Sequence, residues 1–152
     1  MFNDVNEIYN SIAENILTAV SGDWDMVLLN VFIFDVDKSI GIKGVSTYLG
    51  EETFFNILKS DFEHGGISTS AAFLELYKRM KRSDSDTPWN KCRFSLSCDG
   101  DLDIEFKLDL DLKWYCELKH DSQMFEDLDA DIVDLIKTWE GLPDGFDRFW
   151  LV

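Results

Sequence analysis

The sequence predicts an α+β protein: a mainly antiparallel sheet of about four to five strands, with an N-terminal helix, a middle helix and a C-terminal helix packed on it. Three observations predict this fold. Apolar residues recur every three or four positions over residues 5–20, apolar and charged residues alternate over residues 102–112, and helical spacing returns over residues 125–139. The chain has 152 residues, 45% of them hydrophobic, which is enough for the core of a single domain over residues 1–152.

The first predicted element is an amphipathic helix over residues 5–20. Asn3 or Asp4 can cap its start, because both side chains accept hydrogen bonds from N–H groups of a first helical turn. Gly22 stands just past the last apolar position, where glycine commonly ends a helix.

Strands are predicted next. Residues 24–34 are almost continuously apolar and rich in Val, Ile and Phe, which indicates a central strand buried on both faces. Residues 40–48 fit a second strand, in which Gly41 and Gly44 indicate a bulge or the close approach of another backbone. Residues 53–58 fit a strand or a short helix, and we favour the strand.

The middle helix follows a loop at His64-Gly65-Gly66, and the cluster Ser68-Thr69-Ser70 is expected to cap it. The basic residues between 78 and 82 fall at its end, where cations complement the helix dipole. Its apolar stripe consists of Phe73, Leu74, Tyr77 and Met80.

Residues 89–98 and 102–112 predict a hairpin with charge on its outer face. The apolar residues of both strands have even numbers, so the strands share one apolar face only if each pair of facing residues has numbers with an even sum. A three-residue loop, Asp99-Gly100-Asp101, with Cys98 opposite Leu102 meets this condition, and we therefore expect it. This register predicts four pairs: Asp109 with Lys91, Lys107 with Arg93, Glu105 with Ser95, and Asp103 with Ser97.

The last predicted helix covers residues 125–139 and ends before Gly141 and Pro143. Its polar face adds to the acidic charge of the chain. The formal net charge is −16, and residues 99–134 alone carry thirteen acids against three lysines. A charge of this size argues against nucleic-acid binding, which needs a basic surface, and indicates a protein partner.

The sequence contains no recognisable catalytic or metal-binding motif. His64 and His120 and three scattered cysteines lack zinc-like spacing, and the acidic stretches at Asp35 and Asp99 lack the glycine and glutamate positions of a calcium-binding loop. We therefore predict no enzyme activity, no cofactor and no metal. Irregular cysteine spacing predicts free, buried thiols. With neither a signal-like N-terminus nor a membrane-length apolar run, we expect a cytoplasmic protein that does not bind membranes.

The order of these elements resembles the YezG-like immunity proteins of bacterial polymorphic toxin systems. The resemblance covers most of the chain and departs from the family pattern at residues 116–123 and after Pro143. It implies a cytoplasmic antitoxin that binds and neutralises a toxin domain, often a nuclease. The matching stretches are residues 8–16, Pro88-Trp89, residues 94–96, Asp99-Gly100, residues 102–106 and residues 138–141.

The predicted partner is thus a cationic cognate toxin domain, and the predicted contacts are acidic. The alternative is an acidic adaptor module with an unknown protein partner, and each acid can equally be part of a solvated face. Trp89, Trp114 and Trp139 are more often core than interface residues; the toxin's identity and the oligomeric state stay open. The favoured acids are Asp99, Asp101, Asp103 and Glu105. The other candidate contacts are Asp109, Asp111, Trp114, Glu126, Asp127, Asp129, Asp131 and Asp134.

Overall fold

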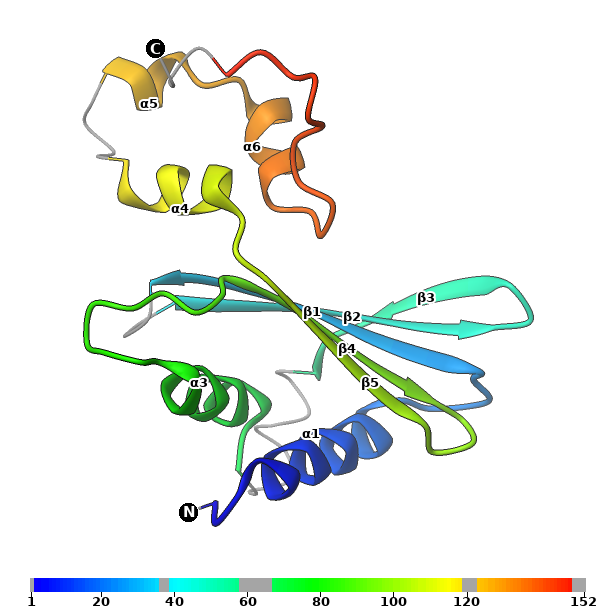
Figure 1. The fold of residues 1–152 in the computed structure, drawn as a ribbon. Coiled ribbons are helices and arrows are strands. Elements are labelled where there is room, and N and C mark those ends of the chain that lie inside the picture. The colour runs from blue at the N-terminus through cyan, green and yellow to red at the C-terminus, as the bar shows by residue number, and fades with distance from the viewer. Residues whose placement is uncertain (1, 36–38, 58–66, 119–122, 149–152) are drawn as a thin grey trace. The chain divides into compact units, whose positions relative to one another are not determined.

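A computed structural model describes residues 2–35, 39–57, 67–118 and 123–148 (Figure 1). The chain divides into two compact units, Met1–Leu108 (unit 1) and Asp109–Val152 (unit 2). A single domain over the whole chain stays a prediction. None of the helices in the described ranges is long and apolar enough to cross a membrane.

Unit 1 contains a five-stranded antiparallel sheet, which confirms the predicted fold class. The strand order is β3-β2-β1-β4-β5, so the apolar strand β1 is central, as predicted. The third strand favoured over residues 53–58 is found as β3, but it begins two residues earlier and ends three residues earlier than predicted. The strands are β1 (Met26–Asp35), β2 (Ser39–Tyr48), β3 (Glu51–Phe55), β4 (Lys91–Ser97) and β5 (Leu102–Lys107).

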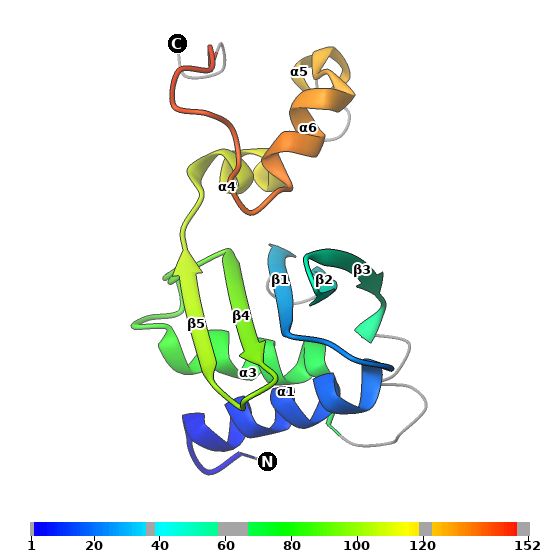
Figure 2. The same ribbon diagram turned by 90° about the vertical axis from the view of Figure 1, so that its right-hand side faces the viewer.

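Two helices, α1 (Val5–Ala19) and α3 (Thr69–Met80), lie on the same face of the sheet (Figures 1 and 2). Each begins at a predicted cap. The Asp4 side chain accepts a hydrogen bond from the N–H of Glu7, and the Ser68 side chain accepts one from the N–H of Ala71. The loop predicted at His64 lies outside the described residues.

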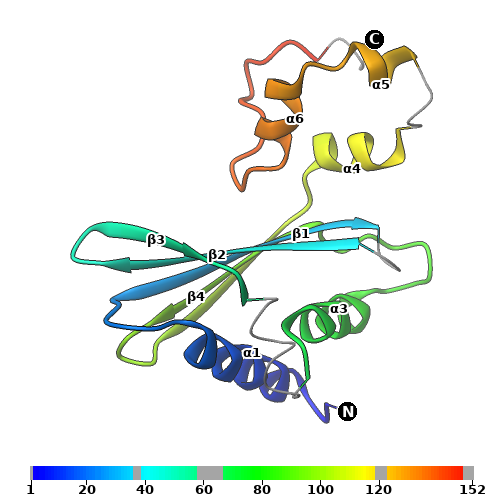
Figure 3. The ribbon, with the colours of Figure 1, turned by 180° about the vertical axis from the view of Figure 1, so that it is seen from behind.

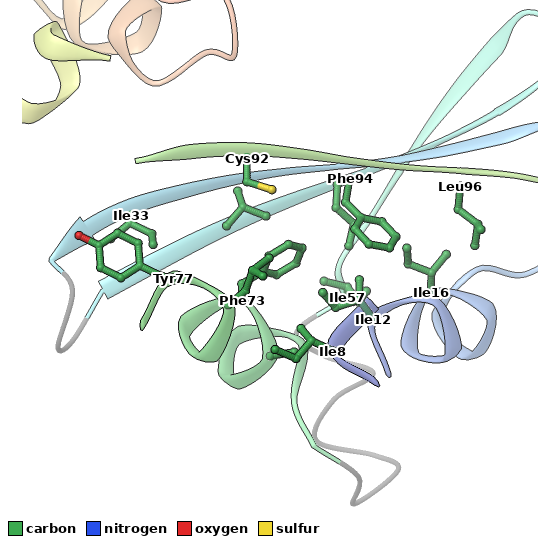
Figure 4. Close-up of a cluster of buried hydrophobic side chains, with 14 of the residues drawn as sticks. Ile8, Ile12, Ile16, Ile33, Ile57, Phe73, Tyr77, Cys92, Phe94 and Leu96 are labelled. Atoms are coloured by element: carbon green, nitrogen blue, oxygen red, sulfur yellow. The ribbon is translucent and has the colours of Figure 1, made fainter. Parts of the chain in front are cut away.

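The core of unit 1 fills the space between the helices and the sheet (Figure 4). Trp89 is completely buried there, with its ring 5.4 Å from those of Tyr77 and Phe106, so its predicted place in the core is confirmed. The prediction that β1 is buried on both faces is wrong for part of the outer face, where Leu28 and Asn30 are only half-buried. The core side chains shown together are Ile8, Ile12, Ile16, Ile33, Ile57, Phe73, Tyr77, Cys92, Phe94 and Leu96.

The hairpin register differs from the predicted one by two residues. Leu96 pairs with Leu102, and the loop is Cys98-Asp99-Gly100, because Gly100 adopts a φ of +92° that favours glycine at the last loop position. The prediction that the two strands share one apolar face is confirmed, because the numbers of facing residues still have an even sum. The observed pairs are Glu105 with Arg93, Asp103 with Ser95, and Lys107 with Lys91.

The predicted strand over residues 102–112 is wrong beyond Lys107. Asp109 instead begins helix α4 (Leu110–Glu117), with its carboxylate accepting hydrogen bonds from the N–H groups of Asp111 (2.9 Å) and Leu112 (3.2 Å). The cap could not be recognised from the alternation of Leu and Asp, because residues 108–112 fit either a strand or the capped start of a helix.

Unit 2 also contains α5 (Gln123–Asp127) and α6 (Ala130–Ile136), which Figure 3 shows from behind. The prediction of one helix over residues 125–139 is therefore wrong. Asp129 separates the two helices. Its backbone is extended, and its side chain accepts a hydrogen bond from the N–H of Asp131 at 2.8 Å, so it caps the start of α6.

At the β2 glycines the close neighbours are aromatic side chains, and not another backbone as the sequence predicted. Gly44 pairs with Phe55 of β3, and a Cβ added to Gly44 would lie 2.6 Å from Cζ of the Phe55 ring. The equivalent atom at Gly41 would meet the Phe34 ring at 3.0 Å, a less severe contact. The ring of Phe55 therefore occupies the space that a side chain at position 44 would need.

We expect Gly44→Ala to lower the free energy of unfolding by roughly 1–3 kcal/mol, as overpacking typically does. Urea unfolding followed by circular dichroism measures the loss, with Gly41→Ala as the matched and milder variant. Adding Phe55→Leu should recover part of the loss by freeing space. A Gly44→Ala midpoint equal to that of the original chain would contradict the contact.

Candidate interaction surface

Asp25 joins three segments at one end of the sheet, seen at the right of Figure 1. Its backbone N–H donates to the Thr47 carbonyl (2.6 Å), and its own carbonyl accepts from the N–H of Cys98 (2.9 Å). Its carboxylate accepts from the N–H of Leu49 (2.9 Å). The start of β1, the β2–β3 turn and the β4–β5 turn are therefore neighbours, although they are far apart in the sequence.

These three segments, residues 21–26, 47–54 and 97–104, contain neither Lys nor Arg. Their acidic side chains are all exposed. Opposing charges are thus absent within the segments themselves, and their carboxylates reinforce one negative potential. We call this set the acidic end: Asp23, Asp25, Glu51, Glu52, Asp99, Asp101 and Asp103.

The acidic end also carries exposed apolar side chains. Leu49 is 79% exposed at the tip of the β2–β3 turn, and Phe54 is 75% exposed on β3. Leu49 and Gly50 have φ values of +50° and +83°, which is the two-residue type I′ hairpin turn. A leucine in this left-handed region costs about 1 kcal/mol relative to the usual backbone conformations.

The favoured acids divide between two environments. Asp99, Asp101 and Asp103 belong to the acidic end, which the sequence analysis located only in part. Glu105 is exposed but lies directly opposite Arg93, so it is not the uncompensated acid that the predicted register made it. The sequence did not predict Asp23, Asp25, Glu51 and Glu52 as site residues. Only the pairing of β1 with both β2 and β4 brings them close to the β4–β5 turn, and this pairing cannot be deduced from a local charge count.

The sheet face opposite α1 and α3 is not a uniformly acidic surface. Lys43, Asn30, Arg93 and Glu105 follow one another across β2, β1, β4 and β5. The Nε of Arg93 donates to the side-chain oxygen of Asn30 at 2.9 Å. Cations thus interrupt the acids of this face, on which the predicted pairing had already placed Lys91, Arg93 and Lys107.

Asp109 and Asp111 have roles within unit 2. Asp109 is buried and caps α4, whereas Asp111 forms a two-pronged ion pair with Arg148, with N–O distances of 2.9–3.1 Å. The hydrogen bond from Arg148 to Asp111 raises the pKa of the guanidinium. Arg148 also donates to the carbonyls of Leu142, Asp144 and Phe146, so this ion pair holds the segment after α6.

The remaining predicted contacts lie in unit 2. Trp114 is half-buried on α4. Asp127 accepts a hydrogen bond from the Gln123 side chain, and Asp129 caps α6. The predicted acids on and beside α5 and α6 are all exposed: Glu126, Asp127, Asp129, Asp131 and Asp134.

Within the described ranges, no group of three or more His, Cys, Asp or Glu residues could hold a metal ion. His64 and His120 lie outside these ranges. Cys92 is a buried free thiol, as expected, and burial raises its pKa. The expected burial is wrong for Cys98, a free thiol exposed in the β4–β5 loop, and for Cys116, which is only half-buried. Cys92 is therefore a neutral core residue, as buried thiols usually are.

No protein-family model matches the chain. The chain is similar to the type VII secretion system protein EsaG of Staphylococcus aureus (strain NCTC 8325 / PS 47), with 25% identity over 109 residues. The aligned region is 67% of this chain and 66% of the length of EsaG. The similarity links the chain to a component of a secretion system, and membership of the YezG-like family stays a prediction.

We expect Asp111→Asn to loosen the segment over residues 142–148, because a neutral amide cannot replace the two-pronged pairing with Arg148. Hydrogen exchange of peptides covering this segment should become faster. Asp134→Asn removes an exposed acid from the same unit and should leave that exchange unchanged. Equal protection in both variants would show that the ion pair does not hold the segment.

Proposed function

We propose that the protein is an immunity protein that binds and neutralises a cognate bacterial toxin domain, and that the acidic end makes the contact. One observation carries the proposal: three segments distant in the sequence bring exposed acids to one place and bring neither Lys nor Arg with them. The similarity to a secretion-system protein supports an immunity-type role in such a system.

The proposed partner is a basic nuclease domain. A nuclease must hold phosphates, so its active site is lined with Lys and Arg. Carboxylates at the end of a sheet can approach such a site, and complementary fields accelerate the encounter. The proposed action is binding alone: the immunity protein occupies the site or its entrance, and no cofactor or reaction is involved.

The acidic end suits this task better than the face of the sheet. Its carboxylates lie in or beside three segments that the hydrogen bonds of Asp25 with Thr47, Leu49 and Cys98 hold together. A backbone that is already ordered loses less entropy on binding. The exposed acids of α5 and α6 are the rival contact surface within the same proposal.

Co-expression tests the function directly. We expect the gene to lie beside one that encodes a toxin domain; that domain should stop bacterial growth when it is expressed alone, and co-expression of this chain should restore growth. The purified pair should also form a complex whose affinity falls as salt rises, because exposed charges are screened. Continued growth arrest together with no complex would overturn the proposal.

Charge reversal tests the surface. The triple variant Asp99→Lys, Asp101→Lys and Asp103→Lys should weaken binding at least about a hundredfold, because like charges then face each other across the interface. Circular dichroism should show an unchanged fold, since all three side chains are exposed.

The matched control reverses three exposed acids of unit 2: Asp127→Lys, Asp131→Lys and Asp134→Lys. It produces the same change in net charge and should retain most of the affinity. If this control loses binding while the first triple variant retains it, unit 2 and not the acidic end is the contact surface.

A further inference from the structure

We infer that the β2–β3 hairpin supplies the apolar anchors of the interface: Leu49 and Phe54 insert into apolar pockets rimmed by Lys or Arg on the toxin domain. This inference rests on the proposed function and adds to it the residues that provide most of the affinity. Interfaces of this kind combine a few buried apolar anchors with a charged rim.

The conformation of Leu49 is the first observation. The type I′ turn requires positive φ at both central residues, and Asn-Gly is its favoured sequence. Here Leu49 precedes Gly50, so the chain has a leucine where asparagine would fit the backbone better. With 79% of its surface exposed, Leu49 contributes little to the core. A strained and exposed apolar residue is best explained by a contact made outside the chain.

The rigidity of the turn is the second observation. The Asp25 carboxylate accepts the hydrogen bond from the N–H of Leu49, and Tyr48 pairs with Glu51 across the turn. The leucine side chain is therefore presented from a fixed backbone. An anchor that is already in place loses less conformational entropy on binding than one on a loose loop.

Phe54 extends the apolar surface along the same hairpin. It is 75% exposed, and it lies opposite Val45, on the sheet face away from α1 and α3. Among the described strands, β3 has a neighbour only on its β2 side, so Phe54 stands at an edge of this sheet. Exposed aromatic side chains at such an edge can enter a partner's pocket with little loss of rotamer freedom.

The acidic residues around Leu49 and Phe54 indicate which kind of partner binds this hairpin. Asp25, Glu51 and Glu52 flank the two anchors, and residues 47–54 contain no basic residue. A second copy of this chain would bring these acids against one another, which disfavours self-association. A partner whose apolar pocket is bordered by cations would gain both the apolar burial and the ion pairs, and a nuclease domain offers such a border.

Leu49→Asn separates stability from binding. Asparagine fits the left-handed conformation, so the melting temperature should rise by about 2–4 °C. Affinity for the purified toxin domain, measured by calorimetry, should fall at least about tenfold. Leu49→Gly is the second variant, and it should also weaken binding. Phe54→Thr keeps a strand-forming residue and should weaken binding without loss of stability.

Leu17→Gln is the matched control. Leu17 is 59% exposed on α1, outside the three segments of the acidic end, and its replacement should leave the affinity unchanged. The inference is overturned if Leu49→Asn and Phe54→Thr bind like the original chain while the reversal of Asp99, Asp101 and Asp103 abolishes binding. If the original chain binds no toxin domain, the proposed function fails, and this inference fails with it.

Discussion

The pairing of β1 on both sides is the constraint on which the rest of unit 1 depends. β1 hydrogen-bonds to β2 along one edge and to β4 along the other, and its register with each fixes which residues share a face. Val27, Leu29, Val31 and Ile33 are buried on the side of α1 and α3. A slip of one residue would turn this row to the opposite face, so the apolar pattern of β1 holds the register of the whole sheet.

The same constraint creates the candidate site. In an antiparallel sheet the start of β1, the β2–β3 turn and the β4–β5 turn all fall at one end, because each strand reverses the direction of its neighbour. Asp25 then completes the arrangement with its hydrogen bonds to Leu49, Thr47 and Cys98. The acidic end is therefore a consequence of topology and does not depend on any local motif.

The sequence was sufficient wherever periodicity and capping agreed. Helices α1 and α3, their caps at Asp4 and Ser68, and the central position of β1 follow from spacing and residue type alone. The alternation from Leu102 to Leu112 was misleading, because Asp109 can serve equally as the outward residue of a strand or as a helix cap. Only the hydrogen bonds from the N–H groups of Asp111 and Leu112 distinguish the two.

The candidate site was predictable only in part, because some of its acids come together only through the pairing of the strands. Asp99, Asp101 and Asp103 are close in the sequence, so a charge count finds them, whereas Asp23 and Glu51 join them through tertiary pairing.

The corrected register also changes what the alternating charges mean. Glu105 lies opposite Arg93, and Lys43 lies two strands from Arg93 in the same row. The face of the sheet therefore carries both positive and negative charges, as a solvated face usually does. In the segments of the acidic end the only charged residues are acids, and Leu49 is exposed there in an unfavourable backbone conformation. Stability alone would favour neither feature, since like charges repel and asparagine suits the turn better. Both are explained together by a cationic partner that covers this end of the sheet.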